Sequence, residues 1–320
     1  MAFLDKLTTL FFKIEGTPYT AETSFTFSDS LPCENIEISP EISSTERKTA
    51  FGDFAYCPSV AGKRSGSIKF DVPIYYSGTA STPPKYFELL RACGMKQTVH
   101  GATGVSLAAS ALYTNVPVTI VVDHINEGTA PVIKRYKFSG CMGEPTLSAA
   151  NVGEYAKISF EFKGVYNGDE DIAYASYAYP SFSCYSPEVI LGIGLSVNGI
   201  NQNANSFTVK LNNDVQLFTD LTKASGFSGA HLTGQHPTME CDPDELTVAS
   251  EDIFTQITGD TPVAAIIELT GGIDIVMPKA QLITSGIGSR ENHYVMQKKF
   301  ELQRDGTSDA VLEIIHGSKT

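Results

Sequence analysis

Alternation of apolar and polar side chains is the feature that most constrains the fold of this chain. In 155–163 the apolar side chains of Ile158, Phe160 and Phe162 face one way, while charged and hydroxyl side chains face the other. A period of two residues is typical of a β-strand with one face in the core and one in water. Similar short runs bounded by Gly, Pro, Asn and Ser occur at 66–76, 116–124, 132–139, 207–211, 263–269, 273–277 and 294–304. The sequence therefore predicts an all-β protein of antiparallel strands.

Two segments have the start and stop signals of a helix. The first lies between Thr82, a candidate N-cap, and Gly94, and its predicted buried stripe is Tyr86, Phe87, Leu89 and Leu90. The second lies between Ser250, a candidate N-cap, and Gly259, and we expect Ile253, Phe254 and Ile257 to pack inward. The predicted class is therefore all-β with minor α.

The order of predicted elements occurs twice along the chain. Strand, long loop, strand, helix and three strands follow one another around 36–168 and again around 207–306. We therefore predict an N-terminal domain at 1–168, a linker at 169–187 and a C-terminal domain at 188–320. Phenol rings are unfavourable when left in water, so we expect this tyrosine-rich linker to lie on a surface. The tyrosines in or beside it are Tyr166, Tyr174, Tyr177, Tyr179 and Tyr185.

Charge and cysteine content narrow the function. The formal net charge is −13, with most of the acidic excess after residue 186, so tight binding to nucleic-acid phosphates is not expected. No apolar run has the length of a membrane-spanning helix, and 1–12 lacks the pattern of a secretory signal. The six cysteines have no CxxC or zinc-like spacing, which is typical of free thiols in a reducing cytosol.

Motifs of known chemistry are incomplete. Gly192-Ile-Gly194 lacks the third glycine of a dinucleotide fingerprint, and 226–229 is one residue short of a nucleophile elbow. His231 and His236 do not have the spacing of a metal pair. Two acidic clusters could suggest calcium or a glycosidase pair, but turns, a helix start and a solvated linker explain them without a ligand. These clusters are Asp242, Asp244 and Glu245, and Asp169, Glu170 and Asp171. We expect no catalytic residue, no metal site and no cofactor.

Five segments carry a family resemblance when they are taken in order. They are TERKTAFG at 45–52, AGKRSGSIKFDV at 61–72, PKYFELLRACG at 84–94, YKFSGCMG at 136–143 and KISFEFKGVY at 157–166. Each segment alone is unspecific, but the series resembles the tail tube (major tail) proteins of long-tailed bacteriophages. The opening KIEGTPYT at 13–20 is similar to a degraded form of that family's start.

The resemblance implies a β-sandwich flanked by one short helix, here in two tandem tail-tube-like copies. In that family neighbouring subunits join their sheets into a barrel, rings stack into a tube, and genomic DNA passes through the lumen without specific binding. It implies a structural virion protein of a siphophage-like tail, made in the host bacterial cytoplasm. Its partners would be other copies and the tape measure, tail terminator and distal tail proteins, with no membrane. The alternative is a β-sandwich module that binds a receptor or glycan, and an enzyme ranks third.

A basic cluster lies in the long loop 44–66, which in several family members reaches the neighbouring ring. Its residues are Arg47, Lys48, Lys63 and Arg64. We predict that they contact an acidic surface of the next ring, the alternative being that they only solubilise a mobile loop. Small family members form hexameric rings from one domain, so two domains predict a trimer with pseudo-sixfold symmetry. The alternative is a hexamer whose C-terminal half decorates the outside.

Overall fold

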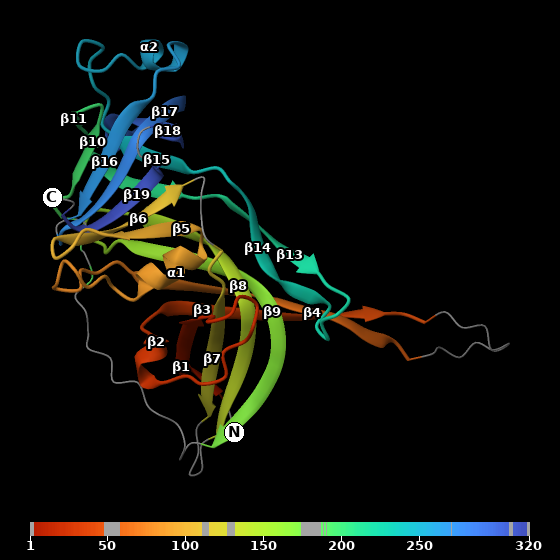
Figure 1. The fold of residues 1–320 in the computed structure, drawn as a ribbon. Coiled ribbons are helices and arrows are strands. Elements are labelled where there is room, and N and C mark those ends of the chain that lie inside the picture. Colours follow the sequence, from red (N-terminus) through yellow and green to blue (C-terminus); the bar gives the residue numbers. More distant parts are fainter. Residues whose placement is uncertain are drawn as a thin grey trace.

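A computed structural model describes residues 3–47, 58–110, 115–126, 132–173, 187, 189, 191–269, 271–306 and 310–318. Within these residues the chain consists of β-strands and two short α-helices, which confirms the predicted all-β class with minor α (Figure 1). In chain order the strands are β1 (Phe3–Ile14), β2 (Ser30–Leu31), β3 (Glu34–Thr45), β4 (Val60–Pro73), β5 (Met95–Val99), β6 (Gly104–Ser110), β7 (Val118–Asn126), β8 (Val132–Ala149), β9 (Lys157–Ala173), β10 (Gly194–Val197), β11 (Ile200–Asn201), β12 (Ala204–Lys210), β13 (Asn213–Thr219), β14 (Phe227–Gln235), β15 (Thr238–Pro243), β16 (Val263–Leu269), β17 (Ile273–Arg290), β18 (His293–Leu302) and β19 (Ala310–Gly317). The helices are α1 (Tyr86–Ala92), α2 (Ile253–Thr258) and the single 3-10 turn η1 (Phe27–Asp29).

Strands of the first half form two sheets that share β8 and β9. One sheet runs β3–β4–β9–β8, and the other runs β2–β1–β7–β8–β9. β8 has 18 residues, which is long enough for its two ends to lie in different sheets. Its ladder with β9 shifts register between Ser139 and Met142. A bulge of this kind bends a strand, which lets β8 pass from one sheet into the other.

The same pairings recur in the second half. The order β12–β15–β18–β17 corresponds to β3–β4–β9–β8, and β11–β10–β16–β17 corresponds to β2–β1–β7–β8. The long strand β17 also has 18 residues and shifts register part-way along its ladder with β18. Each half has its own additions: the hairpin β5–β6 in the first, and the hairpin β13–β14 and the strand β19 in the second.

Two cross-strand ion pairs align the halves residue by residue. Lys69 in β4 pairs with Glu161 in β9 at 3.0 Å, and Glu240 in β15 pairs with Lys299 in β18 at 2.8 Å. The residue pairs beside them are buried and apolar in both halves: Ile68 with Phe162, and Met239 with Phe300. The signs of the charges are exchanged, so the correspondence lies in strand position and not in residue identity.

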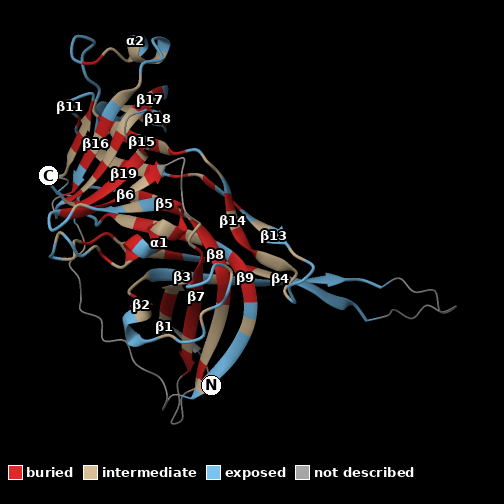
Figure 2. Ribbon diagram, viewed as in Figure 1, coloured by how far each residue is buried: buried red, intermediate tan, exposed pale blue. Residues whose placement is uncertain are grey.

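One hydrophobic core runs through both halves, between the layers of sheet (Figure 2). The alternation predicted for β9 is confirmed, because Ile158, Phe160 and Phe162 are at most 2% exposed. The core continues from the first half into the second through side chains of β8 and β12. The halves therefore share apolar packing and are not separate globules.

Helix α1 follows β4 and packs against the core. The stripe predicted from sequence is confirmed, because Tyr86, Phe87, Leu89 and Leu90 are at most 1% exposed. The predicted cap is wrong: the helix begins after Lys85, which makes no side-chain cap. Thr82 instead closes a turn, its amide donating to the carbonyl of Thr79 at 3.0 Å.

Helix α2 begins two residues later than predicted. Its N-cap is Asp252, whose carboxylate accepts a hydrogen bond from the Thr255 amide at 3.0 Å. Ser250 is thus too far from the first free amides to cap the helix, and that prediction is wrong. Phe254 is 77% exposed, contrary to expectation, whereas Ile253 and Ile257 pack against the core as predicted.

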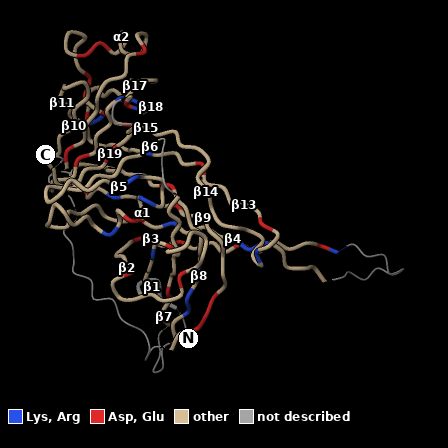
Figure 3. Tube along the Cα trace, in the orientation of Figure 1, with Lys and Arg blue, Asp and Glu red and all other residues tan. Residues whose placement is uncertain are grey.

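Strand β9 crosses the predicted start of the linker at residue 169. Asp169 binds Lys134 and Glu170 binds Lys137, each at 2.7 Å, across the β8–β9 ladder (Figure 3). The hydrogen bond with Asp169 raises the pKa of Lys134 to about 12. The acidic run is therefore a strand end that faces lysines of β8, and residues 174–186 with four of the five linker tyrosines lie outside the described residues.

Candidate assembly interfaces

The two halves meet edge to edge at β8 and β12, and we call this ladder the internal seam. Thr146–Ala149 pairs antiparallel with Phe207–Lys210. Leu147 lies opposite Val209, and these side chains are 1% and 0% exposed. The seam joins β3–β4–β9–β8 to β12–β15–β18–β17, so two equivalent units form one continuous sheet (Figure 1).

A second contact between the halves lies in the other layer. β19 pairs with β6 of the first half on one side and with the beginning of β17 on the other. Its apolar side chains Leu312 and Ile314 are at most 2% exposed. The last described strand thus fastens the second half to the first, independently of the internal seam.

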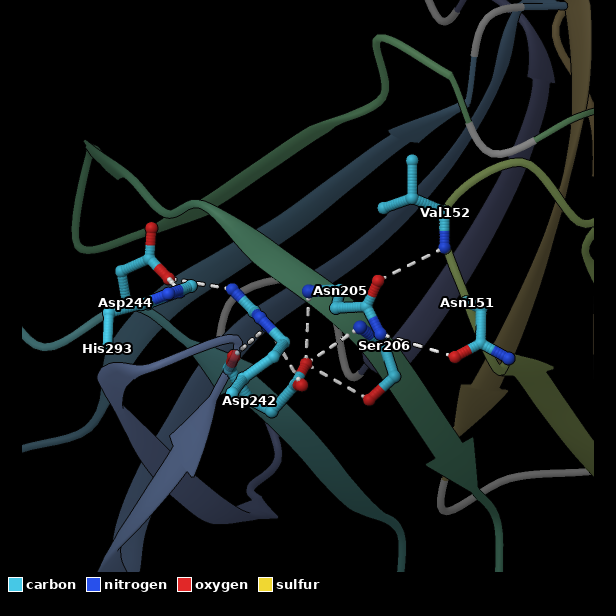
Figure 4. Close-up of polar contacts among 8 residues, drawn as sticks. Asn151, Val152, Asn205, Ser206, Asp242, Asp244 and His293 are labelled. Carbon is cyan, nitrogen blue, oxygen red and sulfur yellow. Dashed lines mark hydrogen bonds and ion pairs between the residues drawn. The ribbon is translucent and has the colours of Figure 1, made fainter.

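Polar side chains fix the end of the seam where the β8–β9 turn meets the start of β12 (Figure 4). The amide of Val152 donates to Asn205 Oδ1 at 3.2 Å, and Asn205 Nδ2 donates to Asn151 Oδ1 at 3.3 Å. Asp242 Oδ1 in turn accepts the backbone amides of Asn205 and Ser206 at 3.1 and 2.7 Å. These contacts hold the turn of one half against the strand start of the other.

The same cluster accounts for acidic residues that could suggest calcium. Arg290 donates to Asp242 at 3.0 Å and to Asp244 at 2.7 Å, and His293 Nε2 lies 3.0 Å from Asp244 (Figure 4). The guanidinium has five donors, so it hydrogen-bonds both carboxylates and offsets one of their two negative charges. The cluster therefore anchors the tip of the β17–β18 hairpin to β15.

The continuous sheet ends in two strands that, among the described residues, pair on one side only. They are β3 at one end and Thr284–Arg290 of β17 at the other, and we call them the free edges. Apolar side chains line both: Ile287 is 70% exposed, Ile42 is 55% exposed and Ile38 is half-buried. Unpaired backbone groups beside exposed apolar side chains are a template for pairing with another chain.

The strands β3 and β4 continue beyond the sheet as a two-stranded arm (Figure 1). The hairpin β13–β14 leans on this arm: the Arg64 amide donates to Ser225 O at 3.0 Å and its guanidinium to Ala224 O at 3.4 Å. Lys63 Nζ lies 5.3 Å from the ring centre of Phe227. Two of the four basic residues predicted to contact the next ring thus contact a hairpin of their own chain.

Of the other two residues of the basic cluster, the structure describes only Arg47. Arg47 is exposed two residues after β3 ends, beyond the point where the hairpin touches the arm. Lys48 lies outside the described residues. Among the three described basic residues, the contact with the hairpin thus involves Lys63 and Arg64 but not Arg47.

An aromatic stack holds the hairpin to the N-terminal segment that follows β1. The ring of His231 lies between Tyr19 and Phe218, with centroid distances of 4.7 and 4.2 Å. The Tyr19 hydroxyl is 3.1 Å from His231 Nδ1, and burial lowers the pKa of His231. The histidine contributes packing and one hydrogen bond, and His236 is not part of the stack.

Within the described ranges no group of three or more His, Cys, Asp or Glu side chains is arranged to hold a metal ion. No described helix is long and apolar enough to cross a membrane. Of the cysteines, four lie in the described part and carry free thiols: Cys33, Cys93, Cys141 and Cys241. The sequence matches no protein-family model and no curated protein.

Sequence reasoning missed the residues of the internal seam. Thr146–Ala149 and Phe207–Lys210 were recognisable as strand segments, because Leu147, Phe207 and Val209 alternate with polar residues. Alternation identifies a strand but not its partner, so no local signal could have placed these two segments beside each other.

Proposed function

We propose that this chain is the subunit of a bacteriophage tail tube, a structural protein that assembles by extending its internal seam from copy to copy. The observation that carries the proposal is that two equivalent sheet units are already joined edge to edge within one chain. The strand that closes the seam in the first unit, β8, has its equivalent in β17, and β12 has its equivalent in β3. The free edges therefore complement each other in the way that the seam strands do.

Head-to-tail pairing of free edges supports a closed ring. A contact between two different surfaces of identical copies either closes by rotation or continues as a filament, and closure leaves no edge exposed. Because one chain supplies two units, three copies give the sixfold repetition of units that the family resemblance implies. The alternative is a hexamer with the second half outside, but in this chain the second half extends the same sheet as the first.

The face of the continuous sheet that points away from the core supports a conduit that does not hold DNA. Its cross-strand ion pairs, Lys69 with Glu161 and Glu240 with Lys299, alternate in sign. Burial and the neighbouring Glu161 raise the pKa of Glu144, and Lys210 across the internal seam offsets part of this rise. Lysines that are neutralised by neighbouring carboxylates offer a phosphate backbone no continuous basic path. We propose that this face lines the lumen.

The arm is suited to contact a stacked ring. It projects from the sheet, and the β13–β14 hairpin contacts its base at Lys63 and Arg64. Contacts of the arm with the next ring, and of the end rings with tape measure, terminator and distal tail proteins, belong to the same proposal.

Electron microscopy of the concentrated purified protein, combined with mass determination of the smallest ring, tests this function. Hollow stacked rings with three chains per ring are the expected result. Rings of six chains would make the second half a decoration. A chain that stays monomeric at every concentration contradicts the tube and favours a receptor- or glycan-binding module, for which a glycan screen is the next measurement.

A further inference from the structure

We infer that the free edges of neighbouring copies pair in one register, in which Ile38 of β3 lies opposite Ile287 of β17. The inference rests on the proposed function and adds the residues that form each junction between copies. Ile36–Ser39 of one copy pairs antiparallel with Gly286–Ser289 of the next. The register is carried over from the internal seam through the correspondence between the two halves.

The position of β3 follows from that of β12. Glu37 pairs with the β4 lysine of the first cross-strand ion pair, and Thr208 pairs with the β15 glutamate of the second. Both ladders also shift register a few residues earlier. Glu37 therefore corresponds to Thr208, and the next residue, Ile38, corresponds to Val209.

The position of β17 follows from that of β8 in the same way. The β9 and β18 members of the two ion pairs face Glu144 in β8 and Thr284 in β17, respectively. Both ladders run without a shift from these residues to the hairpin turn. Three residues further on, Leu147 corresponds to Ile287. Because Leu147 faces Val209 across the seam, Ile287 faces Ile38 between copies.

The side chains at the inferred junction match those of the seam in character. At the seam pair formed by Leu147 and Val209, both side chains are apolar, face the core and are buried. At the free edges the corresponding side chains are also large and apolar, but Ile287 is 70% exposed and Ile38 is half-buried. Pairing in this register covers both isoleucines, and a slip of one residue would turn one of them to the opposite face.

Each junction has a proline directly beyond its last residue pair. In the seam this proline is on β8, and at the inferred junction it is on β3. In the seam the ladder ends at Thr146, and the next residue of β8 is Pro145. At the inferred junction the ladder ends at Ser39, and the next residue of β3 is Pro40, opposite Ser285. Proline has no amide hydrogen and ends an edge ladder, so both junctions stop after the same four residue pairs.

Disulfide trapping tests the register. The double variant Glu37→Cys/Gly288→Cys places two cysteines directly opposite each other, within the 4.4–6.8 Å Cα separation, roughly, that a disulfide needs. Under mild oxidation we expect covalent dimers and trimers on a non-reducing gel, with no larger closed species. The matched control is Glu37→Cys/Gly286→Cys, which moves one cysteine by two residues to about 7–8 Å and should cross-link at least tenfold more slowly.

Two further controls make every outcome decisive. Ser148→Cys/Thr208→Cys, the equivalent pair of the internal seam, should form a disulfide within one chain, and the unsubstituted chain sets the background of its own cysteines. If rings form but the 37/288 variant does not cross-link, or the 37/286 variant cross-links faster, the inferred register is wrong and the proposed tube function still holds. A chain that forms the internal disulfide but neither rings nor intermolecular disulfides overturns both.

Discussion

Leu147 and Val209 are almost fully buried at the internal seam, whereas Ile287 is 70% exposed and Ile38 half-buried at the free edges. The residues occupy equivalent strand positions, and the main difference is that the seam has its partner strand within the chain. The comparison teaches that one type of strand edge occurs here twice, once paired within the chain and once free among the described residues. Substitutions at equivalent positions should therefore affect folding in the first case and assembly in the second.

The largest effect is expected at the seam. Val209→Asp places a carboxylate in the shared core, so we expect a loss of at least about 3 kcal/mol in the free energy of unfolding. The equivalent substitution Ile38→Asp should cost about 1 kcal/mol, because that side chain already contacts water. Urea unfolding of both monomers measures the difference, and equal losses would break the comparison between the two edges.

The next effect is on assembly alone. Ile287→Asp should change the unfolding free energy of the monomer by less than about 0.5 kcal/mol, because the side chain is exposed. It should weaken each junction by about 2 kcal/mol, which raises the concentration needed for assembly about 30-fold. Sedimentation over a concentration series measures this shift, with Tyr294→Asp as an exposed control outside the inferred ladder. An unchanged assembly concentration would show that β17 is not at the junction.

A smaller effect on stability is expected at the arm. Lys63→Glu/Arg64→Glu removes the guanidinium bond to Ala224 and the contact with the Phe227 ring, but it keeps the backbone bond to Ser225. We expect the monomer to lose about 1 kcal/mol or less, with faster amide exchange at 224–227 and impaired tube formation. Hydrogen-exchange mass spectrometry measures the amide exchange, and electron microscopy of the same sample measures tube formation. Normal tubes from the variant would exclude these residues from ring stacking.

The smallest effect is a pH dependence beside the free edge of β3. Burial alone would raise the pKa of Asp71, but hydrogen bonds from Lys157, Ser159 and Asn35 lower it below its ordinary value of 3.8. The charged form thus stabilises the native state above that value, and this contribution is lost as the pH falls through the lowered pKa. Asp71→Asn should cost about 0.5 kcal/mol at pH 7 and progressively less below pH 4. Urea unfolding between pH 7 and 3 measures the difference, which would stay constant if the charge were irrelevant.

Local patterns were sufficient for the elements of this fold. The alternation at Ile158, Phe160 and Phe162 and the stripe on α1 follow from burial of one face, which the sequence encodes directly. Caps were less predictable, because Ser250 and Asp252 are both good N-caps and tertiary packing decides where α2 begins.

Pairings between distant strands could not be predicted. The run Asp169–Asp171 looks like a solvated linker when read alone, and only the lysines of β8 across the ladder make it a strand end. In the same way, nothing in the sequence around Lys63 and Arg64 indicates the hairpin that they contact. Which residues form ion pairs or a seam depends on the register between strands, and a single sequence does not specify that register.

The internal seam also has a consequence for the order of synthesis. The ribosome completes β8 before it makes β12, so a nascent first half displays an open edge equivalent to that of β17. Such an edge could accept β3 of another unfinished chain, and that pairing would leave the second half without a place to bind. The tether gives β12 an effective concentration in the millimolar range, roughly, far above that of any neighbouring nascent chain. In the proposed assembly, covalent linkage of the two units thus protects the growing chain from premature partners and leaves mutual recognition to finished subunits.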